Sequence, residues 1–308
     1  MTKSFPAIAL TVFVFWTGHA AAQIGYGRAA KGGAGGRTVV VRSADDLRKV
    51  AALPEPLIIQ IEGRIAAQAV TMASNKTIEG TGHRPTVHGS LVIPRGTSNV
   101  VVRNLIVTNP TSRKRAEGFD GITIRGGRDV WIDHCTLIDC GDGSIDITEG
   151  ADRITVSHCR FVYSSPDLLH RLVMLAYGPP KKKSRGRLHL TLHHNWFDKY
   201  SGSRMPSSIK AKVHSFNNYF KPGSENDYAS IARKDAEILS ESNFYEGVRN
   251  PLFSEDGGKI RSRNDIFEHC RGKFPGKDQD VFKPDYPYET VSASDVPAIV
   301  KARAGCPL

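Results

Sequence analysis

A short motif recurs along the chain, and it constrains the fold more than any other feature. Each copy is a β-branched run, a bend at Asn or Cys, and an aromatic or aliphatic pair, as in Val156-Ser-His-Cys159-Arg-Phe. Repeats at intervals of roughly 21 to 36 residues are typical of solenoids. The Asn or Cys column comprises Asn104, Cys135, Cys159, Asn195, Asn218, Asn243 and Asn264.

The repeat predicts a stack of β-strand coils. One such coil cannot bury its apolar face alone, whereas stacked coils bury a continuous core and pair their strands about 4.8 Å apart. We expect the Asn amides to hydrogen-bond along the column, and Cys135 and Cys159 to stack there as reduced thiols. The capping box formed by Ser43 and Asp46 predicts a short helix, Ala44 to Leu53, that closes the N-terminal end.

The first 22 residues resemble a secretory signal peptide. Lys3 precedes an apolar run from Ala7 to Trp16, which is too short to span a bilayer, and Ala20-Ala-Ala22 offers a cleavage site. We therefore expect an exported protein, extracellular or periplasmic, with a single domain at 23–308. The alternative is an uncleaved anchor.

The charge balance favours a polyanionic partner. The chain has 42 Lys and Arg against 31 Asp and Glu, a net charge of +11 with a pI near 9.5. Nucleic acid, an anionic membrane and an acidic polysaccharide all fit this charge, and export argues against nucleic acid. We expect no membrane partner. Two basic loops, at 113–115 and 179–187, are either solvated turns or walls of a cleft for the polyanion.

Three acidic residues fall where stacking would gather them on one face. Asp120 and Asp142 lie about one coil apart, and Asp142 and Asp146 share strand parity. Crowded carboxylates repel one another, and a cluster of hard oxygen ligands suits Ca²⁺. Because Asp-Gly pairs also form ordinary turns, the pattern leaves both interpretations open.

A set of segments spread along the chain forms a recognisable series. They are Trp131-Ile-Asp-His134, Asp142-Gly-Ser-Ile-Asp146, Ile154-Thr-Val-Ser157, Leu192-His-His-Asn195, Arg204-Met-Pro206, His214 and Asn217-Asn218. Together these segments resemble the pectate lyase family 1, from about Ile58 to Phe253, and they are specific jointly rather than singly. The resemblance implies an all-β, right-handed parallel β-helix that cleaves α-1,4-linked polygalacturonate by β-elimination and leaves 4,5-unsaturated oligogalacturonates. We expect a monomer.

The resemblance also implies roles for individual residues. The family's calcium ligands match Asp120, Asp142 and Asp146, and its proton-abstracting arginine matches Arg204. Arg233 matches an arginine that contacts the substrate carboxylate, and Arg171 is the nearest match to a family lysine. The family usually has a second basic residue five positions after the catalytic arginine. Here that position is Ile209, so Lys210 would bind substrate only if a local bulge shifts it.

Three other functions compete with this one. The chain could be a lyase for another acidic glycan such as alginate, or a non-catalytic protein that grips an acidic glycan. A polygalacturonase needs paired carboxylic acids, which the Asp cluster could supply, but the Asp-Asp and Gly-His-Gly signatures of that group are absent. We expect His134, His193 and His194 to be structural.

Overall fold

The computed structural model describes residues 23–112, 117–178 and 188–307. The predicted signal peptide and both basic loops lie outside the described residues. No helix within these ranges is long and apolar enough to cross a membrane.

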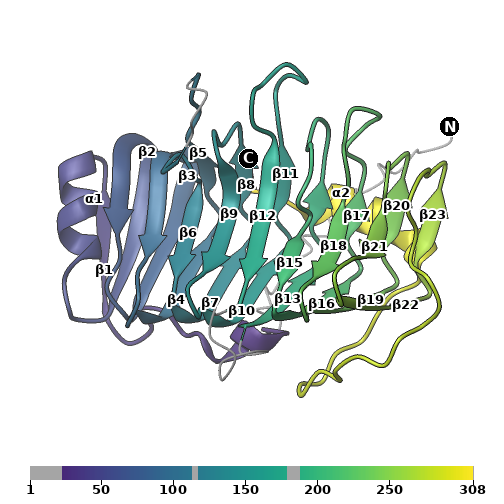
Figure 1. The fold of residues 1–308 in the computed structure, drawn as a ribbon. Helices are drawn as coiled ribbons and strands as arrows, with labels where there is room; N and C mark the ends of the chain where they lie inside the picture. The colour runs from purple at the N-terminus through teal and green to yellow at the C-terminus, as the bar shows by residue number, and fades with distance from the viewer. Residues whose placement is uncertain (1–22, 113–116, 179–187, 308) are drawn as a thin grey trace, which may run out of the picture.

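The described strands all pair in parallel and form a stack of coils, which confirms the predicted right-handed parallel β-helix (Figure 1). Successive coils give one strand to each of three parallel columns. The first sheet contains β6 (Ile122–Arg125), β9 (Gly143–Thr148), β12 (Leu172–Tyr177), β15 (Ser207–Ile209), β18 (Ser230–Arg233) and β21 (Leu252–Ser254).

The second and third columns follow the same order along the stack. The second sheet contains β4 (Ser98–Arg103), β7 (Arg128–Asp133), β10 (Asp152–Ser157), β13 (Leu188–His193), β16 (Ala211–Phe216), β19 (Glu237–Glu241) and β22 (Lys259–Arg263). The third sheet contains β5 (Ile106–Thr108), β8 (Thr136–Ile138), β11 (Arg160–Val162), β14 (Trp196–Phe197), β17 (Tyr219–Phe220), β20 (Phe244–Glu246) and β23 (Ile266–Glu268).

The N-terminal end of the stack is built from longer strands. β1 (Arg37–Val41) pairs with β2 (Leu57–Thr71), and β2 pairs with β3 (Lys76–Ile93). Because β3 bends along its length, it pairs in turn with β4, β5 and β6 and so begins all three columns. Helix α1 (Ala44–Ala51) closes this end, as predicted, and ends two residues before the expected Leu53 (Figure 1). Ser43 Oγ accepts the predicted capping hydrogen bond from Asp46 N at 3.1 Å.

Inside the stack, the predicted Asn column forms a continuous hydrogen-bonded ladder. Asn195 donates from both its backbone N and its Nδ2 to Oδ1 of Asn218 at 2.9 Å, and Asn218 does the same to Asn243 at 2.8 and 3.0 Å. These buried amides thereby satisfy the backbone of each bend.

The prediction is wrong by one residue at both ends of the column. Strand register places Leu105 and Asp265 in the column, while Asn104 and Asn264 occupy the preceding bend with φ of 53° and 55°. Asn tolerates this left-handed conformation well, so Asn is suited to the bend as well as to the ladder. All five cysteines are free, and for the stacked Cys135 and Cys159 this confirms the prediction.

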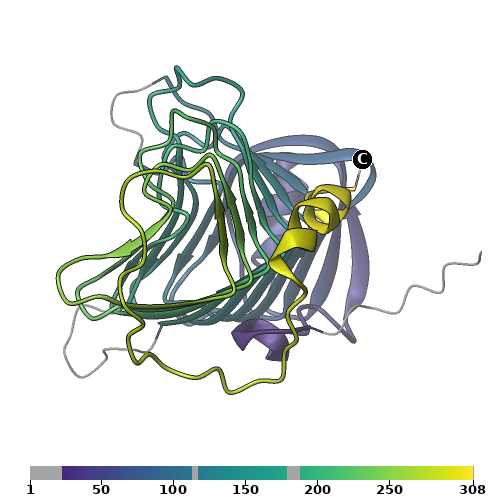
Figure 2. The same ribbon diagram turned by 90° about the vertical axis from the view of Figure 1, so that its right-hand side faces the viewer.

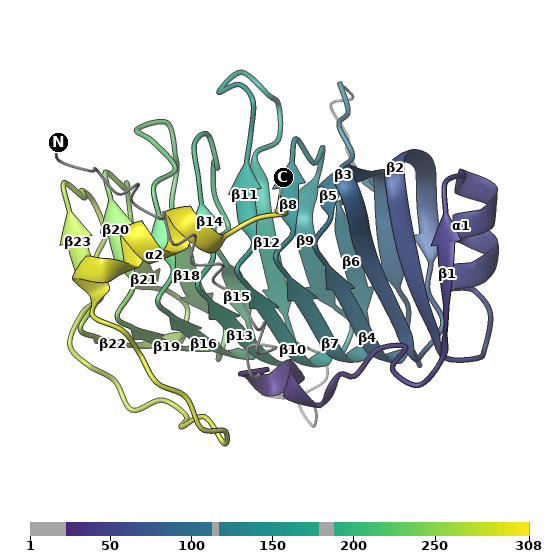
Figure 3. The same ribbon diagram turned by 180° about the vertical axis from the view of Figure 1, so that it is seen from behind.

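The terminal segments lie along the outside of the stack. A 3₁₀ turn at Tyr26–Ala29 crosses the second sheet, where Thr191 and Thr155 accept hydrogen bonds from its backbone (Figure 3). After a 3₁₀ turn at Ala293–Asp295, helix α2 (Val296–Arg303) packs on Tyr219 and Phe244 of the third sheet (Figure 2). The candidate active site lies on the outer face of the first sheet.

Candidate active site

Asp120 and Asp146 flank Gly143 at the outer surface of the first sheet. Alternation in β9 turns Ile145 and Ile147 into the core, so Asp146 between them points outward. A Cβ atom on Gly143 would lie 2.6 Å from Asp146 Oδ1 and 3.1 Å from Asp120 Oδ1. Glycine thus leaves room for two carboxylates to approach the same point.

The two carboxylates differ in their hydrogen bonding. Asp120 is buried, and its oxygens accept hydrogen bonds from Gly143 N at 2.9 Å and Thr123 Oγ1 at 3.1 Å. The buried Oδ1 of Asp146 has no hydrogen-bond partner among the described residues. A buried carboxylate oxygen without a hydrogen-bond donor is suited to ligate a cation.

Burial raises the pKa of all three acidic residues, and repulsion within the cluster adds to the rise at Asp120 and Asp146. The pKa of Asp146 is raised to about 7, first by burial and then by the charges of Asp120 and Asp142. Burial, followed by the charge of Asp142, also raises the pKa of Asp120. The pKa of Asp142 is raised by burial, against the opposing effects of Arg204 and His170. The charge of Asp142 therefore acts on both Asp120 and Asp146, as the cluster prediction requires.

Arg204 lies in a bulge next to these acids. Leu172 bridges Ser203 and Leu175 pairs with Ser207, so two residues of β12 oppose three residues of the neighbouring coil. Arg204 has a φ of 64°, and such a bulge redirects the side chains that it carries. The charge of Arg204 lowers the pKa of both Asp142 and Asp146. The fold therefore brings Arg204 within electrostatic reach of the acidic cluster.

Arg233 points back along the first sheet toward the same region. It pairs in register with Ile209, and its Nη2 donates a 2.7 Å hydrogen bond to Ser207 Oγ, three residues after Arg204. Its buried Nε has no hydrogen-bond partner among the described residues. This guanidinium retains donors for a carboxylate.

The other two predicted substrate contacts are placed differently. Arg171 donates to the backbone carbonyls of Tyr200 at 3.0 Å and Glu225 at 3.3 Å, so part of its donor capacity is used by neighbouring loops. Lys210 occupies the bend after β15 with a φ of 51°. The bulge lies before β15 and does not move Lys210 into the strand, where Ile209 pairs with Arg233.

Four residues of this region were missed by the sequence analysis. Gly143 was interpreted only as part of an Asp-Gly turn, although its small size opens the space between the acids. Ser207 accepts the hydrogen bond of Arg233. Arg125 lowers the pKa of Asp120 and Asp146, and His170 lowers that of Asp142. Strand parity could have found Arg125, which lies two residues after Thr123 in β6.

The donor set fits calcium. Asp120, Asp142 and Asp146 offer only hard oxygen ligands, which Ca²⁺ prefers. Their mutual repulsion and the unpartnered Oδ1 of Asp146 are both relieved by a divalent cation.

Comparisons with known proteins point to one family. A family model described as pectate lyase matches residues 19–305. A pectate trisaccharide-lyase from Bacillus licheniformis is 30% identical over 297 residues, covering 89% of this chain and 82% of that protein. A pectate trisaccharide-lyase from Thermotoga maritima is 33% identical over 202 residues, covering 62% of this chain, and the match spans only 53% of that protein.

A solved structure has the same fold. The pectate lyase from Bacillus sp. N165, in complex with trigalacturonate, superposes with a TM-score of 0.78 and 23% identity over 92% of this chain and 98% of that one. With the family match over nearly the whole described length, the chain belongs to the pectate lyase family of enzymes.

Proposed function

We propose that this protein is an exported, calcium-dependent lyase that cleaves polygalacturonate by β-elimination. The observation that carries the proposal is the acidic cluster of Asp120, Asp142 and Asp146 beside Arg204 on the first sheet. The relatives named pectate trisaccharide-lyases and the neighbour solved with trigalacturonate support the choice of substrate.

Within this proposal, Asp120, Asp142 and Asp146 hold Ca²⁺. When bound, the ion supplies positive charge that stabilises the negative charge developing on the substrate carboxylate. Arg233 adds a charge-assisted hydrogen bond to a substrate carboxylate, and Ser207 holds its guanidinium in place.

Arg204 is the proposed base. A neutral guanidine nitrogen of Arg204 takes the proton from C5 of the uronate, and the electron pair of the C5–H bond forms the new C4–C5 double bond. The C4–O bond to the leaving sugar breaks, and its oxygen leaves with the electron pair and takes up a proton from solvent. The products are a 4,5-unsaturated end and a new reducing end.

The same cluster predicts a preference for unesterified substrate. A methyl ester removes the carboxylate charge that a bound cation and Arg233 would contact. Activity should therefore fall as the methylation of pectin rises.

A substrate panel tests the proposal. Polygalacturonate, highly methylated pectin and alginate are incubated with the protein, with Ca²⁺ or with a chelator, and ultraviolet absorbance is recorded. We expect absorbance from the conjugated product on polygalacturonate alone, its loss with chelator and its return with added Ca²⁺. New reducing ends without absorbance would identify a hydrolase, and absorbance on alginate would identify a different lyase.

The Arg204→Ala variant separates an enzyme from a glycan-binding protein. A lyase should lose turnover and still bind polygalacturonate, whereas a pure binding protein should be unchanged. Export is tested separately: the protein isolated from the medium or periplasm of its host should begin near Gln23.

A further inference from the structure

Histidines gather at the bends that follow the second sheet. In the column of bend residues with φ near 50°, three successive coils have His134, His158 and His194. Left-handed backbone favours Asn, Asp and His, and other coils use Asn104, Asn217 and Asn264 at the same place. Asn suits this backbone conformation as well as His does, so the conformation alone does not explain why three successive bends carry an imidazole.

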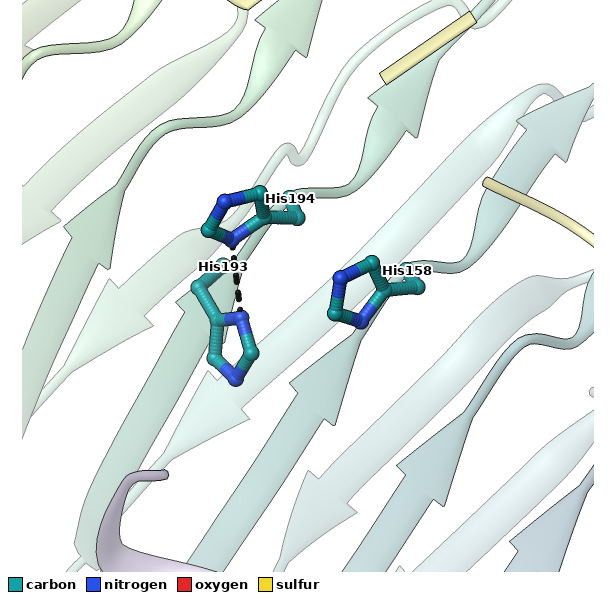
Figure 4. Close-up of side chains that lie close together, drawn as sticks. All are labelled: His158, His193 and His194. Atoms are coloured by element: carbon teal, nitrogen blue, oxygen red, sulfur yellow. Dashed lines mark hydrogen bonds between the residues drawn. The ribbon is translucent and has the colours of Figure 1, made fainter. Parts of the chain in front are cut away.

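Three imidazoles meet at two adjacent bends. His193 ends β13 and His194 follows it, while His158 follows β10 in the adjoining coil (Figure 4). The Nδ1 atoms of His193 and His194 lie 3.0 Å apart, and one nitrogen from each of the three rings lies within 4.8 Å of the others. Two ligands of a tetrahedral Zn²⁺ at about 2.0–2.1 Å are separated by about 3.3 Å, close to the first of these distances.

Asp133 positions the third imidazole. Asp133 Oδ1 lies 3.4 Å from His158 Nδ1 and accepts a hydrogen bond from Ser157 Oγ, while its Oδ2 lies 2.7 Å from His134 Nδ1. A carboxylate on one ring nitrogen fixes the tautomer and leaves the other nitrogen free to bind a metal, an arrangement common around metal-ligating histidines.

One ring nitrogen of this cluster lacks a hydrogen-bond partner among the described residues, and two others share a single contact. His193 is only 4% exposed, and its Nε2 has no hydrogen-bond partner among the described residues. Its Nδ1 and that of His194 share one contact that holds a single proton when both rings are neutral. A cation that replaces this proton gains both lone pairs.

We propose that His158, His193 and His194 bind one first-row transition metal ion, such as Zn²⁺, with Asp133 as the positioning carboxylate. Imidazole nitrogens suit Zn²⁺, Cu²⁺ or Ni²⁺, in contrast to the oxygen ligands of the acidic cluster. The ion clamps two adjacent coils. His158 and His194 are stacked with ring centroids 5.0 Å apart, so binding requires one of the two rings to rotate about χ2.

Zinc titration of the full-length protein tests this site. The protein is stripped of metal, saturated with Ca²⁺, and titrated with Zn²⁺ by calorimetry, with Co²⁺ absorption as a second readout of tetrahedral coordination. We expect one ion per chain and a rise in melting temperature. Absence of stoichiometric binding to the wild type would overturn the proposal.

The chain offers matched variants. His158→Asn and His194→Asn keep a residue suited to the bend, and each should weaken Zn²⁺ binding at least tenfold. Asp133→Asn should weaken binding about 10- to 100-fold, as expected for a residue that orients a ligand. His269→Asn is the control, because His269 is exposed in a bend with a φ of 53°.

Equal Zn²⁺ affinity in the cluster variants and the control would assign binding to the surface and reject the site. Melting in the absence of metal checks that each variant folds. Lyase activity with Ca²⁺ should survive His158→Asn and His194→Asn, so failure here and failure of the proposed function are distinguishable.

Discussion

Asp120 and Asp146 face each other across Gly143, and they are not equivalent. Asp120 has hydrogen bonds from Gly143 N and Thr123 Oγ1, whereas Asp146 Oδ1 is buried without a partner among the described residues. This asymmetry explains why the pKa is raised as far as about 7 at Asp146, where burial and the charge of Asp120 are least compensated. Without a bound cation, the carboxylates of the cluster repel one another, which destabilises the folded state.

Asp146→Asn should stabilise the calcium-free protein. The pKa of Asp146 is about 7 in the folded state, against an ordinary value of 3.8, so the folded state keeps a proton that the unfolded state releases. Stability from this group is therefore lost as pH rises from about 4 to about 7. At pH 8 in chelator, we expect the variant to gain on the order of 2 kcal/mol in the free energy of unfolding.

Calcium should reverse the order of stability of the wild type and the Asp146→Asn variant. Added Ca²⁺ should raise the melting temperature of the wild type and leave Asp146→Asn almost unchanged. Asp256→Asn, at an exposed bend, serves as the control and should behave as the wild type. A wild-type melting temperature indifferent to Ca²⁺ would contradict the assignment of the cluster.

Arg204→Ala should reduce kcat by about 10²- to 10⁴-fold, the usual contribution of a general base. Calcium binding, measured by the melting shift, should persist, because Arg204 opposes rather than provides the ligand charge. Removing its charge should also raise the pKa of Asp142 and Asp146 further.

Arg204→Lys supplies a sharper readout. A guanidine nitrogen accepts a proton only when it is neutral, so kcat of the wild type should rise with pH. An amine loses its proton at lower pH than a guanidinium. The variant should therefore retain weak activity whose rise begins at lower pH. An unchanged pH profile would remove Arg204 from the role of base.

The outer face of β15 predicts an effect on substrate affinity. Ile209 pairs in register with Arg233 there, while Lys210 lies in the following bend. We expect Ile209→Arg to lower KM for polygalacturonate severalfold, because it adds a positive charge next to Arg233 on the first sheet. Lys210→Ala should leave KM within about twofold, since Lys210 lies in the bend and not on the outer face of the strand. A tenfold rise in KM for Lys210→Ala would make Lys210 the substrate contact.

The strands were predictable because the repeat carries their register. A strand that must bury one face repeats its inward residues in every coil, so Cys159, Asn195 and Asn218 mark the column in the sequence itself. The ends failed at Asn104 and Asn264 because Asn suits both the ladder and the neighbouring bend.

Coil length and strand parity placed Asp120, Asp142 and Asp146 on one face, but they left ordinary Asp-Gly turns equally open, and only the family resemblance favoured a ligand cluster. The contacts of the arginines were not predictable. Arg233 contacts Ser207 next to the bulge, and Arg171 donates to loop carbonyls whose positions the repeat does not determine. Side chains that depend on irregular backbone therefore need coordinates.

The Asn ladder should contribute more to stability than any single apolar contact in its layer. Asn218 accepts from Asn195 and donates to Leu192 O, Ser215 Oγ and Asn243 Oδ1. Asn218→Ala leaves several buried partners unsatisfied, each costing about 1–3 kcal/mol. We expect a loss of about 3–5 kcal/mol, measured as a shift of the urea midpoint.

Asn264→Gly is the matched control for this prediction. Asn264 is exposed in the bend rather than in the ladder, and glycine accepts its φ of 55° without strain. Its free energy of unfolding should change by less than about 1 kcal/mol. If Asn218→Ala were as mild as this control, the amide ladder would be a passive filler of the interior, and the stack would depend on its aliphatic and aromatic layers alone.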